Sequence, residues 1–228
     1  MEPRPALILK LLTAEYIQTA TPVASQFLVE KYQLDFSPAT VRNDLADLEE
    51  AGYIIQMHTS AGRIPTELAY RELIKNLQPT TPELADKKSL QPALADFTHN
   101  WKSLAKVLAQ LTNSAVFWSF HRYDSYYTGL SSLLGQPEFK QLSLIYDISQ
   151  VIDSLEEIVD DLFNQIPEKP IIRLGSDSPF GAFSSTIITK YHYQQHIGLF
   201  GLLAPLRTDY QHNFNLINYV HQTIQKKH

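Results

Sequence analysis

Cysteine is absent from the 228 residues of this chain, and glycine is scarce, with only 8 residues. The absence of cysteine excludes disulfides, cysteine-ligated zinc, iron–sulfur clusters and thiol catalysis, and it is typical of a reducing cytoplasm. The few glycines form no phosphate-binding loop. No run reaches the roughly 18 apolar residues of a membrane span, and the first residues are too interrupted for a signal peptide. We therefore expect a cytoplasmic protein without membrane association.

Positive charge is also in short supply. The chain has 19 lysines and arginines against 24 aspartates and glutamates, a net charge of −5. A protein that holds nucleic acid mainly by bulk positive charge has the opposite balance. With 44% hydrophobic and 19% charged residues, the composition is that of a folded protein. If this chain binds DNA, it must do so through a small set of directed contacts.

Proline and small polar residues concentrate between residues 78 and 92, a composition typical of a linker. The sequence thus predicts an N-terminal domain over 1–77, a linker over 78–92 and a C-terminal domain over 93–228. In the first domain, Thr21-Pro22 and Ser37-Pro38 each combine a capping hydroxyl with a proline suited to the first helical position. The predicted order is three helices (about 8–16, from 21 and 37–50), a hairpin (53–57 and 63–65) and a helix (67–77). This order is that of a winged helix-turn-helix domain.

The second domain mixes both kinds of element, so the fold class is α+β, with a mostly antiparallel sheet. Strands are predicted at 115–120, 170–174, 184–191 and 198–203, and helices at 104–111, 138–152, 155–166 and 210–225.

The third helix is the candidate for reading DNA. Val41, Leu45 and Leu48 lie on one side and are expected in the core. The other side then carries short or hydrogen-bonding side chains, namely Ala39, Thr40, Arg42 and Asn43. In the major groove, asparagine can bond adenine, arginine can bond guanine and alanine can touch a thymine methyl group. Ser37, at the start of the helix, is expected to hold a phosphate.

The hairpin turn is the candidate wing. His58, Thr59 and Ser60 can press hydroxyl and backbone groups onto phosphates, and Arg63 can reach the backbone or minor groove. Each feature alone also fits an ordinary solvated surface. Asp44 and Asp47 favour that plainer interpretation, since carboxylates repel phosphate. Helix and wing together favour DNA binding.

Several stretches of sequence resemble the heat-inducible transcription repressor HrcA family. They are T-P-V-A-S at 21–25, S-P-A-T-V-R-N-D at 37–44, H-T-S-A-G-R-I-P-T at 58–66, G-L-S-S-L-L-G-Q-P-E-F at 129–139 and A-P-L-R-T-D-Y at 204–210. The resemblance implies a GAF-like C-terminal domain, here in reduced form. The chain is shorter than family members, because Ala115–Phe120 passes almost directly to Tyr127, where the family carries further strands and an inserted dimerising domain.

What the resemblance implies is a repressor that binds an inverted-repeat DNA operator upstream of chaperone genes as a homodimer, with the chaperonin as a further partner. Two alternatives stay open: a metabolite-responsive winged-helix repressor, and a winged-helix module that binds protein instead of DNA. We expect no catalytic activity, no cofactor and no metal. His192 and His196 lack a third ligand, and Ser103 and Lys106 match an acylase pattern without its partner motifs.

Overall fold

The computed structural model describes residues 2–57, 62–120, 124–140 and 142–226. The chain divides into two compact units, Met1–Leu77 and Gln78–His228. No helix among these described residues is both long and apolar enough to cross a membrane.

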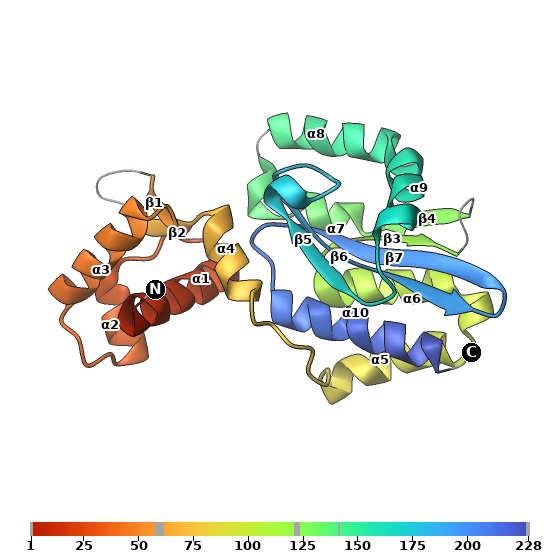
Figure 1. Cartoon of the computed structure of the whole chain (residues 1–228), viewed down its shortest axis with the longest axis horizontal. Coiled ribbons are helices and arrows are strands. Elements are labelled where there is room, and N and C mark those ends of the chain that lie inside the picture. The colour runs from red at the N-terminus through yellow and green to blue at the C-terminus, as the bar shows by residue number, and fades with distance from the viewer. Residues whose placement is uncertain (1, 58–61, 121–123, 141, 227–228) are drawn as a thin grey trace. The chain divides into compact units, whose positions relative to one another are not determined.

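The first unit is a helix-turn-helix fold with a wing (Figure 1). Its elements are α1 (Pro3–Thr19), α2 (Ser25–Tyr32), α3 (Pro38–Glu50), β1 (Ile54–Gln56), β2 (Arg63–Pro65) and α4 (Glu67–Ile74). The two strands pair antiparallel, with Ile54 opposite Pro65 and Gln56 opposite Arg63. One apolar cluster holds the three helices and the wing together, and it includes the fully buried Ile8, Leu28, Val41 and Leu45. The predicted element order is confirmed.

The start predicted for the second helix is wrong. α2 begins at Ser25, its N-cap residue is Ala24, and no side chain caps it. Residues 21–24 are instead extended, because Val23 exchanges two 2.9 Å backbone hydrogen bonds with Arg63 of β2. The wing therefore gains a third short extended segment. Gly62 allows this contact, since a Cβ there would lie 2.5 Å from the backbone of Val23.

The second unit is built on one five-stranded antiparallel sheet in the order β4-β3-β7-β6-β5. The strands are β3 (Ala115–Ser119), β4 (Ser125–Thr128), β5 (Ile171–Leu174), β6 (Ser184–Tyr193) and β7 (His196–Pro205). The helices are α5 (Leu84–Ala95), α6 (Phe97–Thr112), α7 (Leu130–Leu134), η1 (Pro137–Lys140), α8 (Leu142–Asp153), α9 (Leu155–Gln165), η2 (Gly175–Asp177) and α10 (Tyr210–Gln225). The predicted α+β class is confirmed.

Helices cover both faces of this sheet, so the unit has three layers (Figure 1). Side chains alternate between the faces along each strand. Trp118 on β3 therefore joins the core under α5, α6 and α10, and its neighbour Phe117 joins the core under α7, α8 and α9. Both faces are apolar, which explains why β3 reads as a continuous hydrophobic run.

Nine of the fifteen residues of the predicted linker are helical. Residues 84–92 belong to α5, where Leu90 is fully buried and Pro92 lies inside the helix. Proline and polar residues indicated a linker, but burial of Leu90 and Leu94 in the core that α5 shares with α6 and α10 outweighs these local signals. Residues 78–83 form neither helix nor strand and are bonded to α10, because the Asn215 side chain accepts from the Thr80 amide (2.7 Å) and donates to the Thr80 hydroxyl (2.8 Å). Neither β4 nor α7 was predicted from the sequence.

Candidate nucleic-acid interface

The first turn of α3 is capped as predicted. The Ser37 hydroxyl accepts a hydrogen bond from the Thr40 amide at 3.1 Å and contacts the Thr40 hydroxyl at 2.9 Å. Pro38 takes the first helical position. Thr40 is half-buried and turned toward Ser37. These bonds hold the N-terminal end of α3 in one geometry.

Packing decides which side of α3 faces outward. Val41, Leu45 and Leu48 are buried in the core of the first unit. Ala39, Arg42, Asn43 and Ala46 are exposed, and we call these four residues the α3 face. This face offers one guanidinium, one amide and two methyl groups. Those are the groups that pair with guanine, adenine and the thymine methyl in a major groove.

Asp44 does not lie on that face, contrary to the prediction that it would repel a phosphate backbone. It is 2% exposed and receives two hydrogen bonds from Arg4, with Nε to Oδ2 at 2.8 Å and Nη2 to Oδ1 at 2.9 Å. This bond to Asp44 raises the pKa of Arg4. Arg4 was missed at the sequence level because 40 residues separate the partners and no local pattern links them. Asp47, in contrast, is exposed as predicted.

Arg63 is not the free cation that the wing prediction required. Its side chain is 15% exposed, and its Nε lies 3.0 Å from Oε2 of Glu49 on α3. The other carboxylate oxygen of Glu49 accepts from the Gln56 amide of β1 at 3.0 Å. Arg63 and Glu49 together therefore brace the wing against α3. His58, Thr59 and Ser60, predicted to touch phosphates, lie outside the described residues.

The charge of the first unit is concentrated in internal pairs. Residues 1–77 carry 7 basic and 10 acidic side chains, a net charge of −3. Five of the basic side chains lie in ion pairs: Arg4, Lys31, Arg63, Arg71 and Lys75. Arg42 and Lys10 are exposed, and neither is paired with another residue in the described part of the unit. Arg42 is thus the cation that α3 offers to a ligand.

Charged residues near the start of α10 have structural roles. Asp209 caps α10, and its side chain accepts a hydrogen bond from the His212 amide at 3.0 Å. Arg207 donates hydrogen bonds to both carboxylate oxygens of Glu138 and to the Gln136 side chain. It thereby joins the 129–139 stretch to the 204–210 stretch. Among the described residues, no group of three or more histidine, cysteine, aspartate or glutamate side chains is arranged to hold a metal.

Two family models match the chain. The HrcA protein C terminal domain matches residues 44–213, and the DeoR-like helix-turn-helix domain matches residues 9–67. The heat-inducible transcription repressor HrcA of Roseiflexus castenholzii (strain DSM 13941 / HLO8) is 57% identical over 79 residues, which are 35% of this chain and 22% of that protein. The repressor of the same name from Thermobifida fusca (strain YX) is 32% identical over 175 residues, 73% of this chain and 51% of that protein.

The chain therefore spans about half or less of the length of these two relatives. One solved structure, titled as a hypothetical protein at 2.2 Å resolution, has a TM-score of 0.84 and 20% identity. It covers 100% of this chain and 98% of its own. The fold of the whole chain is thus shared with a protein observed in a crystal.

Proposed function

The chain belongs to the HrcA family, and from this premise we propose that it is a sequence-specific DNA-binding repressor of heat-shock genes. Ala39, Arg42 and Asn43 read bases in the major groove. Ser37 and Thr40, at the start of α3, hold the DNA backbone or an adjacent base edge. His58, Thr59 and Ser60 of the wing contact phosphates, while Arg63 positions the wing through Glu49.

The observation that carries this proposal is the composition of the α3 face. Its guanidinium and amide are exposed, and Asp44, which follows Asn43 in sequence, is buried and bonded to Arg4. A second carboxylate, Glu49, is bonded to Arg63. Neutralising both carboxylates removes much of the repulsion that a negatively charged unit would meet at a phosphate backbone.

The small α3 face favours DNA binding by two copies of the chain over binding by one copy. A single α3 offers one cation and a reading edge of a few base pairs, which is too little for tight specific binding. We therefore propose a homodimer on an inverted repeat, in which each copy reads one half-site. In this proposal the repressor acts in the cytoplasm and is regulated by heat shock. A chaperonin is its further partner. Such a repressor needs no catalysis.

Selection from a random double-stranded DNA library, with the whole chain as bait, tests the proposal directly. We expect enrichment of an inverted repeat, and the same repeat ahead of chaperone genes in the genome that encodes this chain. If no sequence is enriched while the protein is folded, the first unit is better regarded as a protein-interaction module.

Two substitutions test the reading residues. Asn43→Ala is expected to cost roughly 1–3 kcal/mol of binding free energy and to relax the preference at an adenine position, and Arg42→Ala should do the same at a guanine. Gel-shift titrations on operators mutated one base pair at a time measure both effects. The matched controls are Gln18→Ala and Lys10→Ala, which change exposed side chains of α1 and should leave the base preference unchanged. An unaltered preference in the Asn43 and Arg42 variants would remove α3 from the reading role.

A further inference from the structure

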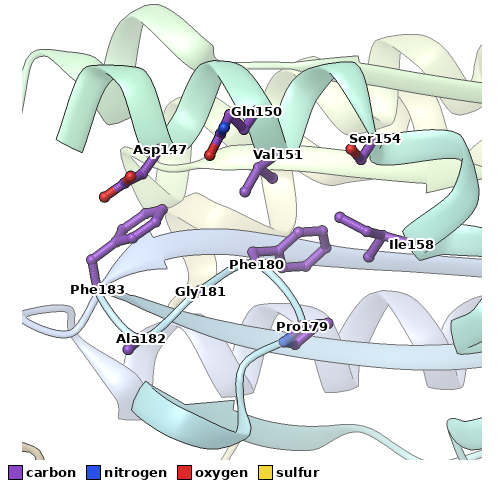
Figure 2. Close-up of a pocket in the computed structure, with 10 residues that line it drawn as sticks. All are labelled: Asp147, Gln150, Val151, Ser154, Ile158, Pro179, Phe180, Gly181, Ala182 and Phe183. Carbon is purple, nitrogen blue, oxygen red and sulfur yellow. The ribbon is translucent and has the colours of Figure 1, made fainter. Parts of the chain in front are cut away.

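The second unit contains an open groove that the DNA-binding proposal does not use. It lies between α8–α9 and the loop that leads into β6, and its volume is about 490 Å³ (Figure 2). This volume lies within the roughly 300–1,000 Å³ typical of small-molecule sites. The groove is large enough for a compact organic molecule and too small for a folded partner.

The apolar wall of the groove is held in place by core packing. Phe180 is fully buried, and its ring centroid lies 5.0 Å from that of Phe117 on β3. Phe183 packs edge-on against Phe139, with centroids 6.0 Å apart. Gly181, at φ +102°, lets the loop turn here, because a Cβ would lie 2.9 Å from the Phe183 ring. The aromatic wall is therefore largely preformed.

The polar wall comes from one side of α8 and from Ser154, the N-cap residue at the start of α9. Asp147, Gln150 and Ser154 follow one another at helical spacing and line the groove. In Figure 2 the Asp147 carboxylate and the Phe183 ring lie at the same end of the groove. Asp147 is half-buried and has no hydrogen bond or ion pair with any residue that the structure describes. An apolar wall and an unpaired carboxylate thus meet at one point.

The segment that supplies the helical wall of the groove carries charge of one sign. No lysine or arginine occurs between residues 141 and 168, whereas Asp147, Asp153, Glu156, Glu157, Asp160, Asp161 and Glu168 do. An anionic ligand would be repelled here, and a neutral one would leave Asp147 without a partner. A cation placed beside Asp147 gains a charge-assisted hydrogen bond, and the organic body that carries it can pack against the Phe183 ring at the same end of the groove.

We propose that this groove binds a small organic cation: a primary ammonium group that pairs with Asp147, attached to an aromatic or branched aliphatic body that packs against Phe180 and Phe183. Gln150 and Ser154 offer hydrogen bonds along the body of the ligand. The site is independent of DNA, so the test below uses the whole chain alone, and its outcome does not depend on whether α3 reads DNA.

Three probes with the same phenylpropyl body and different end groups test the site by isothermal titration calorimetry. We expect 3-phenylpropylamine to bind saturably, and 3-phenylpropanol and 3-phenylpropionate to bind at least about tenfold more weakly. Equal binding of the three, tighter binding of the carboxylate, or no saturable binding of the amine at millimolar concentration would each overturn the proposal.

Two variants locate the binding. Asp147→Asn keeps the size of the side chain and should abolish the preference for the amine over the alcohol, whereas Asp153→Asn removes an exposed carboxylate of the same helix outside the groove and should not. Ala182→Trp, at an exposed position of the lining, should block the amine by filling the groove. Circular dichroism establishes that each variant is folded. Amine binding that survives both Asp147→Asn and Ala182→Trp would place the ligand elsewhere and refute the assignment.

Discussion

Neighbouring polar side chains on α3 differ in exposure, and packing within the first unit explains the difference. Val41 and Leu45 are buried in the core of the first unit, and this packing turns Arg42 and Asn43 toward the outside of the helix. Asp44 follows Asn43 in sequence yet is buried, because it lies one step farther round the helix and meets Arg4. The helical wheel therefore predicts the apolar side of α3 correctly. It cannot predict which charged side chains at the margin find a partner from another helix.

At this same scale, His221 of α10 makes stability depend on pH. It is 9% exposed, and burial lowers its pKa, although hydrogen bonds with the backbone of Glu168 and Lys190 act in the opposite direction. In the unfolded chain a histidine takes up its proton near pH 6.5, while the folded chain does so only at lower pH. The unfolded state therefore binds more protons between these two pKa values. Stability should be fully present above pH 6.5 and fall as the pH drops below it.

Urea unfolding at pH 7.5, 6.5 and 5.5 measures this dependence. We expect the wild-type free energy of unfolding to decline across the series, and His221→Gln, which cannot be protonated, to show a smaller decline. The difference between the two proteins isolates His221 from the other histidines. Parallel declines would mean that His221 has the same pKa in the folded and unfolded states.

At the scale of the element, two similar sequences give different local structures. Ser37-Pro38 starts α3, with the hydroxyl capping the helix, whereas Thr21-Pro22 precedes an extended segment. The hydroxyl of Thr21 instead donates to the Thr19 carbonyl oxygen at 3.1 Å. The difference arises from the bridge between Val23 and Arg63, which holds residues 21–24 away from α2. A local capping signal is overridden where a distant strand supplies hydrogen bonds.

Two substitutions separate the contribution of Ser37 to helix stability from its proposed contribution to DNA binding. Ser37→Ala removes the acceptor of the Thr40 amide and should cost about 1 kcal/mol of unfolding free energy. Ser37→Asp keeps an acceptor and should restore stability, yet it adds a negative charge where we propose that DNA lies. We thus expect Ser37→Asp to be as stable as wild type in urea unfolding and weaker in gel shift. An aspartate variant with unimpaired DNA binding would place Ser37 away from the DNA.

At the scale of the whole molecule, the shortage of unpaired cations among the described residues of the first unit predicts a weak dependence of DNA binding on salt. With Arg42 and Lys10 exposed and unpaired among the described residues, a dimer presents about two to four cations to the duplex. At about 0.9 counterions released per phosphate, log K should fall with log[salt] at a slope of about −2 to −4.

Fluorescence anisotropy with the selected operator, from 50 to 300 mM salt, gives this slope. Lys10→Ala should make it shallower without changing the preferred sequence. A slope of about −7 or steeper would require many more phosphate contacts than the unit offers as folded, and would indicate that ion pairs such as Arg63–Glu49 open on DNA.

The amino-acid sequence by itself determined the winged helix-turn-helix order, the apolar side of α3, the cap at Ser37 and the α+β class of the second unit. These features follow from patterns within about 15 residues, namely hydrophobic period, proline position and capping chemistry. Only the tertiary structure decided that Arg4 neutralises Asp44, that Arg63 braces the wing and that residues 84–92 form a helix. Each of these depends on a partner far along the chain, and burial against that partner outweighs the local preference.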